Sequence, residues 1–311
     1  MTAQARLAVV VLNWNGREDT LRCLDSLRGE IGPGDAVIVV DNGSTDGSPA
    51  AVKAAHPWAE VIETGANLGY AGGNNAGMRA ALDRGFVWVL LLNNDTTVEP
   101  GALGTLHAHG EAHPETGALQ PLLVTAEDPP RVDSMGLRPL RCFGVQDAGQ
   151  GAPASSAPRD PVPILGPCGA AALYRVATLR ETGLLDEDLF LLCEDLDLAF
   201  RVRMAGKEAH VVPEALVRHR RGISGRQGDA AAARRRKFWL QRNTVAMALR
   251  YWPPRWMLLG APLLLWRMFT ALRLSESDLA HPCLPLWGRC LAERGASRRA
   301  LVRAGADRWF A

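Results

Sequence analysis

The sequence predicts an α/β fold, in which a Rossmann-like, mostly parallel sheet is flanked by helices and followed by a helical C-terminal extension. Three observations support this prediction. In the N-terminal part of the chain, short apolar runs alternate with amphipathic stretches. Residues 86–92 are apolar throughout, which is typical of a parallel strand covered on both faces. From about Phe238 onward the chain becomes rich in Trp, Leu and Arg, which favours a helical extension.

The individual elements follow from local patterns, in chain order. Strands are expected at the apolar runs 7–12, 36–40, 61–64 and 87–92. Helices are expected between them, at 17–28, 48–55 and 71–84. The first helix has an apolar face that consists of Leu21, Cys23, Leu24 and Leu27. Residues 147–163 are rich in Ala, Gly, Ser and Pro, which indicates a mobile surface loop.

Bulk composition restricts the class of protein. The 35 Lys and Arg residues nearly balance the 33 Asp and Glu residues, so the net charge of +2 gives no general signature of nucleic-acid binding. The six cysteines form no C-x-x-C pair, which favours a reducing, cytosolic compartment, and the N-terminus shows no secretory pattern. The most apolar stretch, 256–272, contains Pro262 and Arg267 and is short for a membrane span. We therefore expect it to lie on a membrane rather than cross it.

A single carboxylate follows the fourth predicted strand, in the run Leu92-Asn93-Asn94-Asp95. Open α/β sheets bind ligands beyond the carboxyl ends of their strands. Asp95 is therefore expected at the reaction centre, where it can hold a divalent metal against a diphosphate. The alternative is that Asn94 and Asp95 only form a turn and cap a helix that begins near Glu99.

The second predicted strand also ends in an acid, Asp41. Its carboxylate is expected on the same edge of the sheet as Asp95, where it can accept hydrogen bonds from a base or a ribose. The Asn-Gly-Ser-Thr-Asp-Gly tract that follows is also typical of a tight loop that ends in a helix cap. Two acids at strand ends on one edge favour the binding role.

Glycines are concentrated in the tract 67–77, after the third predicted strand. Glycines before a helix permit close backbone approach and expose N–H groups to an anion, and the residues predicted to bind a ligand here are Asn67, Gly69 and Asn74. The chain has neither G-x-G-x-x-G after the first strand nor G-K-[ST], so dinucleotide and Walker-type phosphate sites are disfavoured. The alternative is helix–sheet packing that requires small residues.

A second pair of acids, Glu194 and Asp195, stands at the start of a predicted helix whose Leu198 and Val202 would pack inward. Acids are common in the first turn of a helix because they interact favourably with its dipole. In the functional interpretation, one of the two carboxylates points into the cleft and takes a proton from an attacking hydroxyl.

Downstream, His219 lies within the basic run 218–221. Such runs are usually solvated. If the acidic sites bind a nucleotide diphosphate, Arg or His side chains of this run are expected to stabilise its negative charge.

Five motifs together resemble the inverting family 2 glycosyltransferases. They lie in that family's order between about residues 7 and 245, and the rhamnosyltransferase-like branch is the most similar. The motifs are Val11-Leu12-Asn13-Trp14-Asn15-Gly16, Val40-Asp41-Asn42-Gly43-Ser44-Thr45-Asp46, Asn67-Leu68-Gly69, Leu92-Asn93-Asn94-Asp95 and Glu194-Asp195-Leu196-Asp197-Leu198. The resemblance implies the GT-A fold, a nucleotide-diphosphate sugar as donor, and Mg²⁺ or Mn²⁺.

The resemblance also implies roles for single residues. The nucleotide would be held by Leu12, Trp14 and Asp41. The sugar diphosphate and the metal would be held by Asn94 and Asp95. Asp195 would be the base, Glu194 would orient it or bind acceptor hydroxyls, and the segment 166–170 would line the acceptor side.

The sequence departs from the commoner D-x-D pattern of this family, because Asn93 replaces the first acid. One direct carboxylate ligand, Asp95, remains. A metal would therefore also rely on the diphosphate, on water and on His219.

The implied reaction is a single displacement with inversion. The donor would be dTDP-, UDP- or GDP-linked, and rhamnose or another deoxysugar is the sugar that the resemblance favours. The acceptor would be a hydroxyl of a glycan or of a lipid-linked molecule in cell-envelope or polysaccharide synthesis. Two alternatives stay open: a sugar nucleotidyltransferase, which would release pyrophosphate, and a non-catalytic glycan-binding or scaffold protein with the same fold.

We expect a GT-A domain at 1–237, in which 1–120 binds the nucleotide sugar and 121–237 carries the acceptor and catalytic groups, and a helical extension at 238–311. The expected location is the cytoplasm, with peripheral contact to the inner face of the plasma membrane and no nucleic-acid partner. A homodimer interface is the alternative use of the apolar tail. The side chains expected to meet lipid are Trp252, Trp256, Trp266, Arg250, Arg255, Arg267 and Arg273.

Overall fold

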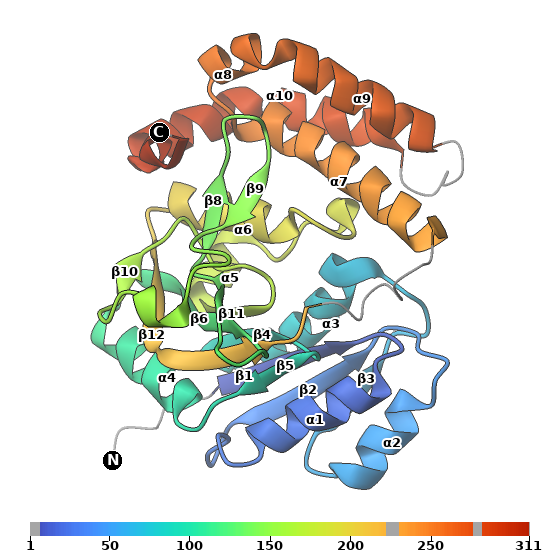
Figure 1. The fold of residues 1–311 in the computed structure, drawn as a ribbon, viewed down its shortest axis with the longest axis vertical. Coiled ribbons are helices and arrows are strands. Elements are labelled where there is room, and N and C mark those ends of the chain that lie inside the picture. The colour runs from blue at the N-terminus through green and yellow to red at the C-terminus, as the bar shows by residue number, and fades with distance from the viewer. Residues whose placement is uncertain (1–6, 222–229, 276–281, 311) are drawn as a thin grey trace.

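A computed structural model describes residues 7–221, 230–275 and 282–310 of the chain, and Figure 1 shows a sheet with helices on both faces and a layer of helices at one end. The strands are β1 (Leu7–Asn13), β2 (Ala36–Asp41), β3 (Glu60–Glu63), β4 (Trp88–Asn93), β5 (Thr96–Val98), β6 (Thr116–Thr125), β7 (Val132–Ser134), β8 (Leu137–Pro139), β9 (Val145–Asp147), β10 (Val162–Pro163), β11 (Ala171–Arg175) and β12 (Glu208–His219). The helices are α1 (Arg17–Leu27), α2 (Ser48–Ala55), α3 (Gly69–Asp83), α4 (Ala102–Ala112), α5 (Val176–Thr182), α6 (Glu194–Met204), α7 (Ala230–Tyr251), α8 (Pro254–Leu259), α9 (Ala261–Ser275) and α10 (Cys283–Arg303). Short 3₁₀ turns are η1 (Ala154–Ser156), η2 (Glu187–Leu189) and η3 (Ala306–Phe310).

The main sheet has the strand order β10-β12-β6-β11-β4-β1-β2-β3, with β5 paired to β12 and β7 to β6. Strands β4, β1, β2 and β3 run parallel to one another. Strands β6 and β12 are also parallel, but β11 is antiparallel to both of its neighbours, β4 and β6. The predicted α/β fold with a helical C-terminal region is confirmed, and its sheet is parallel in the first half and mixed in the second.

Alternating side chains of the central strands supply two cores, one on each face of the sheet. In β1, Val9 and Val11 join the cluster that contains Leu24 of α1, whereas Val10 joins the cluster that contains Met78 of α3. This period of two explains why the predicted strands are apolar throughout. The α/β architecture therefore follows from the apolar runs themselves.

The predicted elements lie close to the observed ones. The first four strands begin and end within about one residue of their predicted limits, and the helix 48–55 is observed as predicted. The helix expected near Glu99 begins only at Ala102, after β5. The segment 147–163, expected to be a mobile loop, instead contains η1 and β10, and Val132 donates a backbone hydrogen bond to Ala152.

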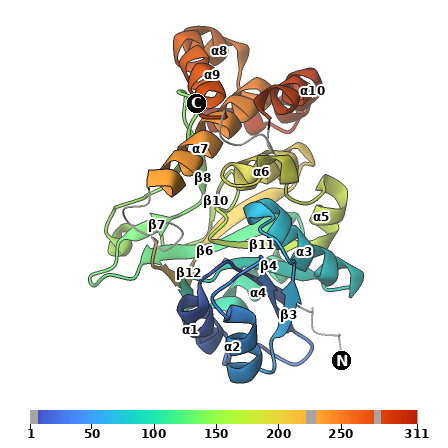
Figure 2. The ribbon, with the colours of Figure 1, turned by 90° about the vertical axis from the view of Figure 1, so that its right-hand side faces the viewer.

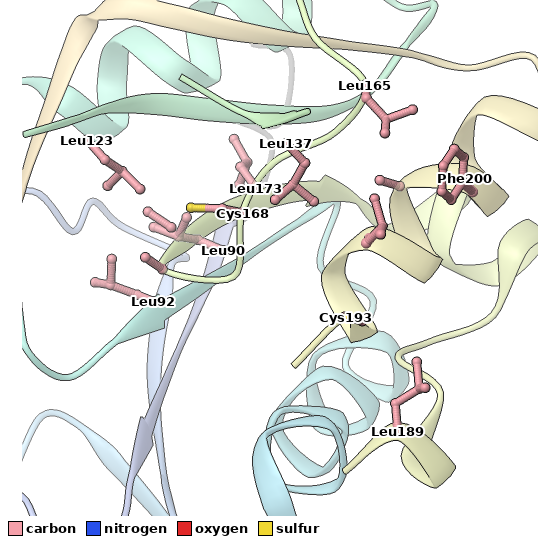
Figure 3. Packing of buried hydrophobic residues seen from close by; sticks show 14 of the residues in the cluster. Leu90, Leu92, Leu123, Leu137, Leu165, Cys168, Leu173, Leu189, Cys193 and Phe200 are labelled. Carbon is pink, nitrogen blue, oxygen red and sulfur yellow. The ribbon is translucent and has the colours of Figure 1, made fainter. Parts of the chain in front are cut away.

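The C-terminal helices share the core of the sheet domain. One continuous apolar cluster runs from β1 and β4 through Phe200 of α6 to Trp252 and α10, and Figure 3 shows part of it, from Leu90 and Leu92 to Phe200. Figures 1 and 2 both place α8 and α9 at the end of the molecule that lies away from α1 and α2. Phe238, where the composition changes, lies inside α7.

Two residues expected to meet lipid are buried instead. Trp252 is fully buried, and Arg250 forms ion pairs with Asp197 and Glu293. The prediction of a lipid contact was wrong for these two side chains, because the C-terminal end of α7 and the residue after it pack against α6 and α10. Among the described residues, no helix has the length and apolarity needed to cross a bilayer.

Candidate active site

The carboxyl ends of β1, β2 and β4 meet at one edge of the sheet. In register, Asn13 lies beside Asp41 and Leu12 lies beside Asn93. Asn13 is fully buried and donates from Nδ2 to Asp41 Oδ1 over 2.8 Å. The parallel pairing thus brings the polar residues at three predicted strand ends together, as expected for this class of sheet.

Asp41 is buried and organises the loop after β2. Besides the bond from Asn13, its Oδ2 accepts the backbone N–H of Ser44 over 3.0 Å. Asp46, in the same loop, accepts the N–H of Ser48 at the start of α2, and the N-cap position itself is occupied by Gly47. Each carboxylate oxygen of Asp41 retains a second lone pair for a ligand. Trp14, at the end of β1, is 49% exposed and offers an aromatic face nearby.

The glycine-rich tract before and within α3 is explained mainly by packing. A Cβ at Gly73 would lie 2.5 Å from Leu12 Cδ1, and one at Gly77 would lie 2.4 Å from Val10 Cγ1. Gly69 has a φ of +73°, a conformation that favours glycine. The small residues therefore let α3 approach β1 closely, which supports the packing alternative.

The N–H groups expected to face an anion in this tract already have protein partners. The N–H of Gly69 bonds to Asn67 Oδ1 over 2.9 Å, and that of Ala71 bonds to the carbonyl of Phe190. Asn74 differs, because within the described residues its buried Oδ1 has no hydrogen-bond partner. The prediction that this tract presents free backbone N–H groups was wrong for Gly69 and Ala71, and Asn74 keeps an open acceptor.

Asn94 is tied into the edge of the sheet. Its Nδ2 donates to Thr20 Oγ1 over 2.9 Å and to Asn13 Oδ1 over 3.2 Å. A Cβ at Gly16 would lie 2.3 Å from this Nδ2, so only glycine leaves room for the side chain. The amide nitrogen of Asn94 is therefore occupied, and its side chain fixes the turn that presents Asp95.

Asp95 faces a histidine and caps no helix. Its Oδ1 lies 3.2 Å from His219 Nε2, while His219 Nδ1 lies 2.8 Å from Asp133 Oδ2. All three side chains are buried or nearly so. Burial opposes protonation of the imidazole, but the hydrogen bonds and charges of Asp133 and Asp95 outweigh it and raise the pKa of His219 to about 9.

The Asp95 and His219 pair can also hold a divalent cation once the proton on His219 Nε2 is lost, because only the unprotonated nitrogen ligates a metal. A histidine that ligates a metal typically gives its other ring N–H to a carboxylate, which is the position of Asp133. Within the described residues, no group of three or more His, Cys, Asp or Glu side chains is placed to hold a metal ion. The protein therefore supplies one carboxylate and one imidazole, and the remaining ligands would be substrate oxygens and water.

The arginines of the run 218–221 are paired with acids. Their partners are Glu99 for Arg218, Asp19 for Arg220, and both Asp133 and Asp147 for Arg221. Arg220 also lines a cleft of about 540 Å³ beside the β1–α1 turn, together with Asn15, Gly16, Arg17, Glu18, Asp19, Arg22 and Asp46. These arginines were expected to be solvated or to face a phosphate. Instead, Arg218, Arg220 and Arg221 form ion pairs with acids, and a bound diphosphate would have to compete with those carboxylates.

Glu194 and Asp195 begin α6, and they differ in their surroundings. Asp195 is half-buried and accepts the N–H of Leu196 at Oδ1 over 2.7 Å and that of Gly169 at Oδ2 over 3.1 Å. Burial raises the pKa of Asp195 to about 6, although these N–H groups oppose the shift. Burial and the charge of Asp195 hold the pKa of Glu194 well above its ordinary value, and within the described residues its Oε2 has no partner. Asp195 is thus ionised near neutral pH, whereas the surroundings of Glu194 favour its neutral form.

The segment before α6 has an unusual backbone. Phe190, Leu192 and Cys193 all have positive φ angles, of 59°, 72° and 73°. Asn243 of α7 is fully buried and donates from Nδ2 to the carbonyls of this segment; the acceptors are Leu189, Leu191 and Leu192, at 2.7, 2.9 and 2.8 Å. Helix α7 therefore holds the loop that leads into the acidic pair.

One backbone segment, Gly169–Ala170, is hydrogen-bonded to Asp195 at one end and to the end of β4, near Asp95, at the other. Gly169, which donates to Asp195, precedes Ala170, whose carbonyl accepts the N–H of Asn93 over 3.0 Å. Tyr70 of α3 donates its hydroxyl to the carbonyl of Gly169. The segment 166–170, which was expected to line the acceptor side, thus contacts both Asp195 and the end of β4.

Three residues of this site were not predicted as site residues. Asn13 carried a signal, since it ends a predicted strand within a family motif. Asp133 and Asn243 carried none, because each acts on a residue far away in the sequence, His219 and Leu192 respectively.

Comparison with known proteins gives consistent results. The family model described as "Glycosyl transferase family 2" matches residues 8–181. The chain is 31% identical over 211 residues to the N-acetylglucosaminyl-diphospho-decaprenol L-rhamnosyltransferase of Mycobacterium tuberculosis, which covers 61% of this chain and 67% of that protein. It is 28% identical over 200 residues to the galactofuranosyltransferase GlfT1 of the same organism, which covers 63% of this chain and 64% of that protein.

A solved structure supports the fold. The mannosyltransferase PcManGT of Pyrobaculum calidifontis, in complex with GDP-Man and Mn²⁺, superposes with a TM-score of 0.56 at 19% identity. The superposition covers 99% of this chain and 85% of that chain. The likeness therefore extends over the C-terminal helices as well as the sheet.

Proposed function

The chain belongs to glycosyltransferase family 2, and from this premise we propose that it transfers a sugar, with inversion, from a nucleotide diphosphate to an acceptor hydroxyl. The observation that carries the proposal is the position of the segment Gly169–Ala170 between two acidic centres. One end of it bonds to Asp195, and the other bonds to Asn93, two residues before Asp95. A donor held at Asp95 and an acceptor held at Asp195 would meet along this segment.

The donor would bind at the edge formed by β1, β2 and β4. The base and ribose would contact the exposed ring of Trp14, the backbone at Leu12 and the remaining lone pairs of Asp41. Asn74 offers its open Oδ1 to the sugar, whereas Asn67, Gly69 and Asn94 would act by fixing the loops around it. Because their polar groups already form hydrogen bonds within the protein, Asn67, Gly69 and Asn94 are proposed to shape the donor site rather than to bind the donor directly.

Asp95 and His219 would hold Mg²⁺ or Mn²⁺, with Asp133 fixing the imidazole. When bound, such a cation neutralises negative charge that develops on the departing diphosphate. The Mn²⁺ in the mannosyltransferase of similar fold supports this part of the proposal by analogy.

Asp195 is the proposed base. Its carboxylate accepts the proton of the acceptor hydroxyl as that oxygen bonds to the anomeric carbon. The bond between the anomeric carbon and the diphosphate oxygen breaks on the opposite face, so the configuration inverts and a nucleoside diphosphate leaves. Two backbone N–H groups orient the carboxylate for this step, and the pKa of about 6 leaves it ionised at neutral pH.

The sugar and the acceptor are proposed from the relatives. The rhamnosyltransferase supports rhamnose or another deoxysugar, and its name describes a lipid-linked diphosphate acceptor. The galactofuranosyltransferase supports a second possibility for the sugar. We place the reaction in cell-envelope or polysaccharide synthesis, at the inner face of the plasma membrane.

A panel of dTDP-, UDP- and GDP-linked sugars tests the proposal. Binding is measured by thermal shift with and without Mn²⁺, and product is measured as released nucleoside diphosphate. At least one donor should stabilise the folded protein in a metal-dependent way and should be hydrolysed or transferred. Release of pyrophosphate from a nucleoside triphosphate would support a nucleotidyltransferase instead. Donor binding with no turnover on any acceptor would support a binding or scaffold role.

A further inference from the structure

The outer face of helices α8 and α9 is apolar and uncovered. Six large side chains on it have exposed fractions between 41% and 79%. They are Leu258, Leu259, Leu265, Trp266, Phe269 and Leu272, and we call them the outer ridge. Figures 1 and 2 place these two helices as the outermost layer of the C-terminal region. Contiguous apolar surfaces of this kind usually mark a contact with a protein or a membrane.

Helix α9 is apolar on both of its faces. Its inner face packs through Leu264 and Ala271, which are buried, and its outer face carries most of the outer ridge. Only Arg267, Thr270, Arg273 and Ser275 among its fifteen residues are polar. A helix that is hydrophobic all round is normally buried all round. The outer ridge therefore requires a second covering surface.

The charge around the outer ridge is positive. Helices α8 and α9 carry three arginines, Arg255, Arg267 and Arg273, and no Asp or Glu. Arg255 and Arg273 flank the outer ridge and are exposed, and Arg141 stacks over Trp256 at 4.6 Å from the ring centroid. An apolar face bordered by cations is typical of helices that lie in the interface of an anionic membrane.

We propose that the outer ridge docks the protein on the surface of a bilayer that contains anionic lipid, with α9 lying in the plane of the membrane. This inference rests on the proposed function in one respect, because a lipid-linked acceptor requires the enzyme to work at a membrane. At about 1.5 Å per residue, α9 extends about 22 Å, which is shorter than a hydrocarbon core of about 30 Å. Docking within one leaflet is therefore the geometry that its length permits.

The outer ridge is better suited to contact with lipid than to contact with a second copy of the chain. In a two-fold dimer the same patch meets itself, so Arg255 and Arg273 of both copies would share one interface. Helices α8 and α9 offer no acid to pair with them, and like charges across an interface disfavour association. The phosphates of anionic lipids supply the missing negative charge.

Co-sedimentation of the full chain with vesicles tests this inference. We expect the wild-type protein to sediment with phosphatidylcholine vesicles that contain phosphatidylglycerol, and to bind pure phosphatidylcholine vesicles more weakly. The test variant is the double substitution Leu265→Glu with Phe269→Glu, which should weaken vesicle binding by about tenfold or more. The matched control is Leu291→Glu with Val302→Glu on α10, where two side chains of similar exposure change in the same way and binding should persist.

The readouts separate failure of docking from failure of the proposed function. Donor binding and turnover with a water-soluble acceptor should be equal in the wild type and in both double variants, because the outer ridge lies outside the proposed donor and acceptor sites. Equal vesicle binding by the wild type and the Leu265→Glu, Phe269→Glu variant would overturn the inference. So would a wild-type protein that ignores anionic vesicles but forms a dimer that this variant abolishes in analytical ultracentrifugation. If the wild type bound no donor, the proposed function would be contradicted, and the vesicle assay would still decide whether the outer ridge docks on a membrane.

Discussion

Asn243 donates a hydrogen bond to the carbonyl of Leu192, two residues before the acidic pair, and the two residues lie 51 positions apart in the sequence. The same amide also holds the carbonyls of Leu189 and Leu191. Non-glycine residues with positive φ persist only when the surrounding structure fixes them. We infer that α7 keeps the loop before α6 in the conformation that presents Asp195.

Replacing Asn243 should therefore slow catalysis more than it weakens donor binding. Asn243→Leu removes the amide that donates to the carbonyls of Leu191 and Leu192, so we expect kcat to fall by about tenfold or more and the free energy of unfolding to fall by about 2 kcal/mol or more. Asn243→Gln retains an amide and should recover part of the rate. Steady-state kinetics and urea unfolding measure the two effects. A variant that loses stability but keeps the wild-type kcat would show that Asn243 only stabilises the fold.

Substitution of the acidic pair distinguishes the base from its neighbour. Asp195→Asn should lower transfer by about 10²-fold or more and leave donor affinity unchanged, which is the usual scale for loss of a general base. Glu194→Gln should retain most of the activity, because burial raises the pKa of Glu194 and so favours a neutral carboxyl, which the amide of Gln resembles. Calorimetric titration of the donor serves as the control for folding. If Glu194→Gln were inactive and Asp195→Asn active, the role of base would move to Glu194.

The rate should depend on pH through Asp195. Its pKa of about 6 means that the carboxylate predominates above pH 6 and loses its basic form below it. We expect kcat/KM to rise with pH and to reach half its plateau near pH 6. A profile that stays flat through pH 6 would argue against Asp195 as the base.

The same shift makes a prediction for stability. Because the folded-state pKa lies above the ordinary value of 3.8, the folded protein binds this proton more tightly than the unfolded chain does. The stability associated with the protonated form is therefore lost as pH rises from about 4 to about 6. Relative to the wild type, Asp195→Asn should gain in thermal midpoint across that interval and keep the gain at higher pH.

Metal dependence should be sensitive to Asp95 and to Asp133. Asp95→Ala should abolish metal-dependent donor binding without unfolding the protein, which calorimetry with and without Mn²⁺ would detect. Asp133→Asn removes the negative charge beside His219 Nδ1 and should raise the Mn²⁺ concentration for half-maximal activity by about 10- to 100-fold.

Asp147→Asn is the matched control for Asp133, because Asp147 also pairs with Arg221 but has no bond to His219. Asp147→Asn should leave the Mn²⁺ response unchanged. The measurement is made at pH 8 because the charge of Asp147 contributes to the raised pKa of Asp195, and at pH 8 Asp195 is ionised in both the wild type and the variant. Equal effects of the two substitutions would assign the role of Asp133 to Arg221 rather than to the metal site.

The sequence by itself determined the elements and the position of the acids along the chain. Apolar runs followed by Asp41 and Asp95 place both acids at strand ends, since the period of two along a strand and the turn after it are local properties. The first turn of α6 placed Glu194 and Asp195 by the same local reasoning. The family motifs added the expected roles of these residues.

Only the tertiary structure decided which groups face one another. Asp133, Asn243 and Gly169 act on residues distant in the sequence, and no local pattern records such pairs. Arg250 and Trp252 are of residue types common in membrane anchors, yet they pack against α6 and α10. Leu265 and Phe269 on α9 stay exposed. Periodicity in the sequence indicates which residues share a face of a helix or strand. Whether that face is buried depends on the segment that packs against it, which is often distant in the sequence.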